Sequence, residues 1–164
     1  MARSLELDSA PEDVARAMLS RACGSSRWVD RMMARRPFGR DAKMLTAARV
    51  EWFALSEPDW LEAFSHHPRI GDRAALEERF PETHELSSKE QSGIGIAGAD
   101  LLTALAQANV DYFDRFGFIF IVCATGKSAA EMLALLVSRL QNDRATELRI
   151  AVEEQAKITA LRLS

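Results

Sequence analysis

The chain has 164 residues, 48% of them hydrophobic and 27% charged, which fits one ordinary domain of roughly 100–200 residues. Its 21 Lys and Arg against 24 Asp and Glu give a formal net charge of −3, so we expect no nucleic-acid or membrane partner. The sequence has no apolar run of the roughly 20 residues that a membrane-spanning helix needs. Two cysteines, Cys23 and Cys123, exclude a disulfide framework and indicate reduced thiols.

The first half of the chain predicts a series of helices, because capping residues and prolines recur at the starts of apolar stripes. The first expected helix starts with a capping box at Ser9 and Glu12 and stops near Gly24, and a short second helix ends before Pro37. The third is capped by Asp41, and the fourth starts at Ser56 and ends at Pro68.

The second half of the chain predicts three longer helices after a polar region, 72–98. Asp100 is expected to open the first, on which Leu105 and Tyr112 share one apolar stripe. Ser128 with Glu131 predicts the start of the next helix. The last is expected from about Arg144, with an apolar face listed here in full: Leu148, Val152, Gln155, Ile158 and Leu161.

One β-like run, Phe118–Cys123, is continuously apolar. A lone strand cannot form a sheet and no second run is available to pair with it, so we interpret the run as an extended, buried connector. The predicted fold is therefore an all-α, single-domain helical bundle over residues 1–164 with one buried extended segment.

The segment 65–73 is the first candidate for chemistry. It places His66 and His67 at a helix end, followed by the rigid Pro68 and by two arginines. A histidine with a pKa near neutrality, held on a turn beside cations, suits acid–base chemistry on a small anion. The alternative is a plain helix end, in which a histidine caps the last carbonyl groups.

The second candidate lies at Ser87, Glu90 and Gln91. Ser87 and Glu90 alone form a capping box, which predicts a helix start and nothing more. The same residues also offer a hydroxyl, a carboxylate and an amide to a polar ligand beside free backbone N–H groups. Both interpretations are compatible with the sequence.

Two other sequence patterns resemble ligand-binding motifs but lack the context that those motifs need. The run Gly93–Gly98 matches G-x-G-x-x-G, but the polar residues 88–92 stand where a dinucleotide-binding motif needs a strand. The three histidines, His66, His67 and His84, lack the spacing of a metal site. We therefore expect neither a dinucleotide nor a metal.

Four motifs together resemble those of the 2-oxo-4-hydroxy-4-carboxy-5-ureidoimidazoline (OHCU) decarboxylase family of urate breakdown, and they cover nearly the whole chain. They are the run from His67 to Gly71, the spacing of Ser87, Glu90, Gln91 and Gly93, the run from Phe116 to Ala124, and the C-terminal group Lys157, Ile158, Leu161, Arg162 and Leu163. The resemblance implies an all-helical homodimer that converts OHCU to (S)-allantoin and CO2 without a cofactor. The short connector Ala124–Lys127 departs from the longer basic loop of many members.

The resemblance also implies roles for individual residues. His67 would be the central acid–base residue, Glu90 would assist the proton transfer, and Arg162 would hold a carboxylate or carbonyl oxygen. The other implied substrate contacts are Pro68, Ser87, Gln91 and the backbone of the extended run, represented by Ile119, Ile121 and Cys123. An extended run exposes the N–H and C=O groups that a helix would use internally.

Two alternatives remain open from the sequence. One is another hydrolase or lyase that uses the same His and Glu pair on a small polar ring. The other is a helical interaction module without catalysis. Without a signal peptide or a peroxisomal C-terminal tripeptide, the chain is expected in the cytoplasm.

Overall fold

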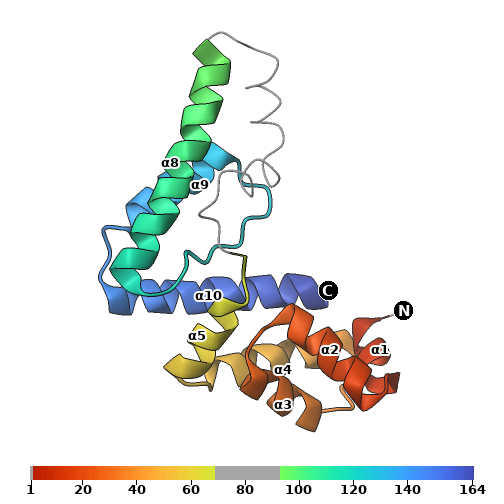
Figure 1. Cartoon of the computed structure of the whole chain (residues 1–164). Helices are drawn as coiled ribbons and strands as arrows, with labels where there is room; N and C mark the ends of the chain where they lie inside the picture. Colours follow the sequence, from red (N-terminus) through yellow and green to blue (C-terminus); the bar gives the residue numbers. More distant parts are fainter. Residues whose placement is uncertain (1, 69–92) are drawn as a thin grey trace. The chain divides into compact units, whose positions relative to one another are not determined.

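The structure is a computed structural model that describes residues 2–68 and 93–164. These residues contain helices and no strand, which confirms the predicted all-α class. The helices in Figure 1 are α1 (Arg3–Ser9), α2 (Glu12–Ala22), α3 (Ser26–Ala34), α4 (Asp41–Phe53), α5 (Glu57–Ser65), α8 (Gly93–Phe116), α9 (Ala129–Arg139) and α10 (Arg144–Leu163).

The chain divides into two compact units, and each is built from separate stretches of sequence. The first consists of Met1–His67, Ile121–Cys123 and Arg149–Ser164, and the second of Pro68–Phe120 and Ala124–Leu148. The expectation of one domain over 1–164 stays a prediction.

In the first unit, α3 contacts α2, α4 and α5, and α1 contacts α2 and α4. Two buried indoles bind the core together through N–H groups that would otherwise be unsatisfied. Trp28 Nε1 donates to the Ala48 carbonyl at 3.0 Å, and Trp52 Nε1 donates to the Val152 carbonyl at 2.9 Å. The second bond fixes the last part of α10 against α4.

Two of the predicted helix caps are wrong. Ser9 is the last residue of α1, a helix that the sequence did not predict, and its hydroxyl donates to the Leu5 carbonyl at 2.8 Å rather than capping α2. Asp41 lies inside α4, and its carboxylate accepts the backbone N–H of Ser4 at 2.8 Å. This bond lowers the pKa of the Asp41 carboxyl. Both side chains serve α1, which depends on contacts from distant sequence.

Two other predicted helix starts are confirmed. At α5, Ser56 donates through both its backbone N–H and its hydroxyl to the Asp59 carboxylate. At α9, the Ser128 hydroxyl accepts the N–H of Glu131 at 3.2 Å. These caps are local in sequence, which is why the pattern alone predicts them.

In the second unit, α8 packs against α9, as Figure 1 shows. The predicted start of α8 at Asp100 is wrong, because the helix begins at Gly93 and includes the whole G-x-G-x-x-G run. It ends where Gly117 adopts a positive φ of 80° and donates its N–H to the Phe113 carbonyl at 2.8 Å. This conformation favours glycine, which explains the glycine between Phe116 and Phe118.

A buried charged cluster in the second unit joins α8, α9 and the first part of α10. Glu147 on α10 accepts hydrogen bonds from Tyr112 on α8, at 2.6 Å, and from Arg139 on α9. All three side chains are at least 95% buried. Burial and the hydrogen bond to Glu147 raise the pKa of Tyr112, so the phenol stays neutral and donates.

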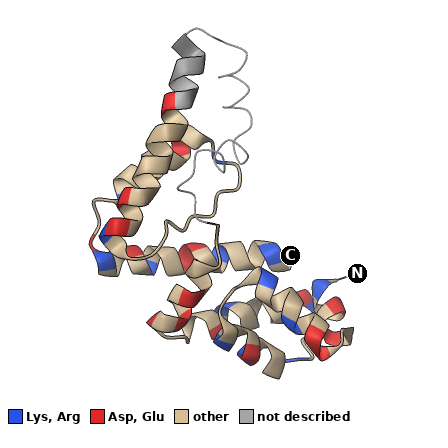
Figure 2. Cartoon of the chain, in the orientation of Figure 1, with Lys and Arg blue, Asp and Glu red and all other residues tan. Residues whose placement is uncertain are grey.

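The run Phe118–Cys123 has no regular secondary structure and is largely buried, which confirms the predicted extended segment. None of the helices within the described residues is long and apolar enough to cross a bilayer. Figure 2 shows positively and negatively charged residues interspersed on α1 to α4, in keeping with the small net charge.

Candidate active site

The two adjacent histidines stand at the end of α5. The helix closes at Ser65, and the backbone N–H groups of His66 and His67 still donate to the Ala63 and Phe64 carbonyls, each at 3.2 Å. These bonds hold both residues in a fixed turn. Successive residues in such a turn point in different directions, so the two imidazoles meet different surroundings.

His66 is exposed and has a structural partner. Its Nδ1 lies 3.0 Å from the Gly24 carbonyl oxygen, and since a carbonyl only accepts, Nδ1 carries the proton. A Cβ at position 24 would overlap the His66 ring. Gly24 is therefore required by the close approach of this ring to the backbone.

His67 is half-buried and points to a different partner. Its Nε2 lies 2.5 Å from Oε1 of Gln155, a side chain of α10 that is only 1% exposed. The Gln155 amide nitrogen donates to the Thr159 hydroxyl at 3.0 Å, and that hydroxyl donates to the Ala22 carbonyl at 3.4 Å. A chain of hydrogen bonds thus leads from His67 into the core of the first unit.

The surroundings lower the pKa of His67. Burial is the main cause, and the positive charges of Arg162 and His66 act in the same direction, whereas the hydrogen bond to Gln155 opposes them. A histidine with a lowered pKa is neutral at physiological pH and is available as a proton acceptor.

Arg162 is exposed near the end of α10. Its Nη1 atom donates to the carbonyls of Arg21 and Ala22, both at 3.4 Å, which are the last two residues of α2. Its charge is close enough to affect the pKa of His67. Arg162 and the chain of hydrogen bonds from His67 therefore meet at one group, the Ala22 carbonyl.

Glu154 anchors the extended segment within the first unit. Its Oε1 accepts the N–H of Cys123 at 3.2 Å, and its Oε2 pairs with Lys157 at 2.6 Å. The backbone donor expected to contact substrate at Cys123 is thus directed to this carboxylate. Ile121 belongs to the same unit and is buried, while Ile119 belongs to the second unit.

The other predicted site residues are only partly covered by the described residues. Pro68 is described and exposed, but Ser87, Glu90 and Gln91 lie outside the described residues. Sequence reasoning missed Glu154 and Gln155 as site residues. A usable signal existed for Gln155, which is a polar residue on the predicted apolar face of the last helix.

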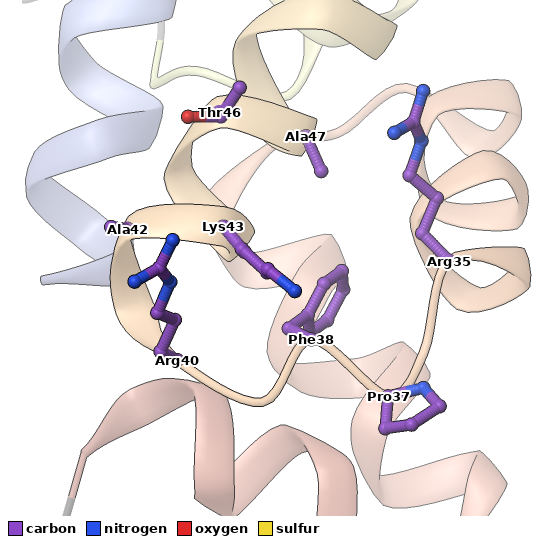
Figure 3. A pocket seen from close by; sticks show the side chains of 8 residues that line it. All are labelled: Arg35, Pro37, Phe38, Arg40, Ala42, Lys43, Thr46 and Ala47. Carbon is purple, nitrogen blue, oxygen red and sulfur yellow. The ribbon is translucent and has the colours of Figure 1, made fainter.

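A separate cavity of about 360 Å³ lies in the first unit (Figure 3). It is lined by Arg35, Pro37, Phe38, Arg40, Ala42, Lys43, Thr46 and Ala47. Arg35 is paired with Glu51 at 2.7 Å, and Figure 3 shows the Lys43 amine directed toward Phe38. Its polar lining consists of two guanidinium groups, an amine and a hydroxyl, and the residues that line it include no imidazole or carboxylate. The group of His67, Gln155, Thr159 and Arg162, called the His67 cluster below, is the better candidate for acid–base chemistry.

Among the described residues, no three His, Cys, Asp or Glu side chains are close enough together to hold a metal ion. The groups at the His67 cluster are instead an imidazole, an amide, a hydroxyl and a guanidinium. Groups of these kinds are able to bind and orient a polar molecule and to transfer protons.

The fold and the cluster together define a class: an all-helical protein whose candidate acid–base group is a half-buried histidine at a helix end. Comparison with known proteins specifies the family. The family model for OHCU decarboxylase matches residues 8–164, and the chain belongs to this family.

The relatives agree with this assignment. A uric acid degradation bifunctional protein of Arabidopsis thaliana is 38% identical over 142 residues, covering 87% of this chain and 44% of the relative. The OHCU decarboxylase of Amia calva is 38% identical over 73 residues, covering 44% of this chain and 42% of the relative. This chain thus aligns with less than half the length of either relative.

A solved structure extends the comparison to the fold. A crystal structure of OHCU decarboxylase in the presence of (S)-allantoin matches with a TM-score of 0.70 and 36% identity, covering 94% of this chain and 96% of the other. A crystal structure of (S)-allantoin synthase matches with a TM-score of 0.69 at 19% identity, which supports the fold alone.

Proposed function

We propose that this protein decarboxylates OHCU to (S)-allantoin and CO2 in urate degradation. Support comes from the family, from relatives that are named for urate degradation or OHCU decarboxylation, and from the similar structure obtained in the presence of (S)-allantoin. The observation that carries the proposal is the half-buried His67, whose pKa is lowered by burial and whose chain of hydrogen bonds ends at the Ala22 carbonyl, which also accepts from Arg162.

The substrate supplies its own electron sink. When the C–C bond to the carboxylate breaks, its electron pair moves toward the adjacent ring C=N bond, CO2 leaves, and the nitrogen of that bond takes up a proton from solvent. The hydroxyl then loses its proton as its carbon becomes a carbonyl, and the neighbouring ring carbon takes up a proton. The enzyme therefore has to orient the substrate, move protons and select the face that is protonated. None of these tasks requires a cofactor.

The site residues divide these tasks. Neutral His67 accepts the proton of the substrate hydroxyl as CO2 leaves and later returns a proton, while Glu90 assists. Arg162 holds a substrate oxygen with the planar donor set of its guanidinium. The remaining proposed substrate contacts are Pro68, Ser87, Gln91, the backbone at Ile119 and Ile121, and the carbonyl group of Cys123, whose N–H is bonded to Glu154.

The assembly and location of the protein belong to the same proposal. Two copies would form a homodimer in the cytoplasm, with no resident cofactor, supported by the motifs that the chain shares with the family. Sedimentation equilibrium tests the assembly, because a dimer has twice the chain mass of 18.2 kDa.

The proposed reaction is tested with freshly generated OHCU, followed by circular dichroism for (S)-allantoin and by CO2 release. His67→Asn removes the titrating group and should lower kcat by about 10²–10⁴-fold. The matched control, His66→Asn, should stay within a few-fold of wild type, because His66 bonds to Gly24. Both variants must keep the wild-type melting transition.

Two results would contradict the proposal. A His67→Asn variant with wild-type rate would remove His67 from the chemistry, and a different product would indicate another lyase or a hydrolase. Absence of any acceleration by the wild-type protein would favour a non-catalytic module.

A further inference from the structure

We propose that Gln155 is a positioning residue that keeps the proton of neutral His67 on Nε2 and leaves Nδ1 as the atom that accepts a proton from the substrate. The catalytic importance of this assignment rests on the proposed function, whereas the tautomer itself can be measured without it.

The direction of the hydrogen-bond chain follows from its inner end. The Ala22 carbonyl can only accept, so the Thr159 hydroxyl that bonds to it must donate its single proton there. Toward Gln155 the Thr159 oxygen can then act only as a hydrogen-bond acceptor, and it accepts from the Gln155 amide nitrogen at 3.0 Å. This order turns the Gln155 carbonyl oxygen toward His67.

The outer end of the chain then has one arrangement. Oε1 of Gln155 lies 2.5 Å from Nε2 of His67, and an amide oxygen cannot donate. Nε2 must therefore carry a proton, and in the neutral ring the lone pair resides on Nδ1. Gln155 is 1% exposed, so it acts on the substrate only through His67.

The charged and titratable groups around His67 leave this assignment intact. On α10, Arg162 is a cation and cannot accept a proton from the His67 ring. At the end of α5, the Nδ1–H group of His66 is hydrogen-bonded to the Gly24 carbonyl. At the end of α2, burial raises the pKa of the Cys23 thiol to about 11, so the thiol is uncharged near neutral pH. On α5, Glu62 accepts the N–H and hydroxyl of Ser26.

Two substitutions at position 155 have opposite expected effects. Gln155→Leu removes the acceptor and lets both neutral tautomers form, so kcat should fall about 10–100-fold through misplacement of the lone pair. Gln155→Glu places a carboxylate against Nε2 and favours the charged ring. The acid limb of kcat/KM should move to lower pH in Gln155→Leu and to higher pH in Gln155→Glu.

A third variant tests the chain rather than the amide. Thr159→Val keeps the side-chain size and removes only the hydroxyl, so the Gln155 amide loses the partner that fixes its orientation. Gln107→Leu is the control, because it also removes a glutamine amide from a helix. The Gln107 amide is exposed, and among the described contacts it bonds only to Asp111.

The deciding measurement is 15N NMR of the histidine rings at a pH where His67 is neutral, with His67→Asn used for assignment. We expect the Nε2–H tautomer of His67 in the wild type and in Gln107→Leu, and a mixture in Gln155→Leu and Thr159→Val. A wild-type Nδ1–H tautomer, or an unchanged Nε2–H tautomer in both of the latter variants, would overturn the inference. Failure of the wild-type protein to decarboxylate OHCU would refute the proposed function and leave the tautomer result standing.

Discussion

Single residues decide which of two adjacent histidines is available for chemistry. His66 donates a hydrogen bond from Nδ1 to the Gly24 carbonyl, and His67 donates one from Nε2 to Oε1 of Gln155. The neighbouring residues therefore share a turn but differ in exposure and in their partners. The sequence favoured His67 through the motif match, whereas the structure adds the physical difference.

At the same scale, His67 should make stability depend on pH. Burial lowers its pKa below the ordinary value of 6.5, so the unfolded chain takes up this proton more readily than the folded one. The contribution of neutral His67 to the free energy of unfolding is complete above about pH 6.5. It is lost as the pH falls through the lower pKa that His67 has in the folded protein. Urea unfolding across this range should show a smaller acid loss for His67→Asn than for wild type. Equal losses would contradict it.

At the scale of elements, the sequence predicted those features that depend on neighbouring residues. Ser56 and Ser128 cap helices as expected, because cap and partner are three residues apart. The helix α1 was missed because its Ser4 N–H is held by Asp41, 37 positions away. Likewise, Gln155 was placed on the buried face of α10, but its partner His67 is 88 positions distant, beyond what local patterns reveal.

The buried cluster of the second unit gives a prediction about its helices. Glu147→Leu leaves the buried cation of Arg139 without this carboxylate and removes the acceptor of Tyr112. The free energy of unfolding should therefore fall by about 3–5 kcal/mol. In the control Glu153→Gln, an exposed pair with Arg49 is lost, and the change should stay below about 1 kcal/mol. Urea denaturation measures both, and similar effects would refute the assigned role.

At the scale of the whole molecule, charge and chemistry support the proposal of an enzyme that acts on a small molecule. The net charge is −3, and both signs are interspersed on the helices of the first unit. The proposed substrate brings its own electron sink. The groups that the structure assembles at His67 are those that move protons and hold oxygen atoms.

The proposed chemistry therefore predicts that activity is independent of metals. Exhaustive dialysis against EDTA should leave kcat and KM for OHCU unchanged, because the electron pair of the breaking bond goes to the substrate ring. A metal-free buffer without chelator serves as the control. Activity that disappears with EDTA and returns with added zinc or magnesium would contradict this chemistry.

The discontinuous first unit has a consequence for biosynthesis. Trp52 is bonded to Val152, 100 positions later, and Thr159 is bonded to Ala22, 137 positions earlier. On the ribosome, helices α1 to α5 emerge long before the residues that complete their core. The first unit therefore cannot complete its core before Arg149–Ser164 have been synthesised, and until then the nascent helices expose apolar surface to chaperones.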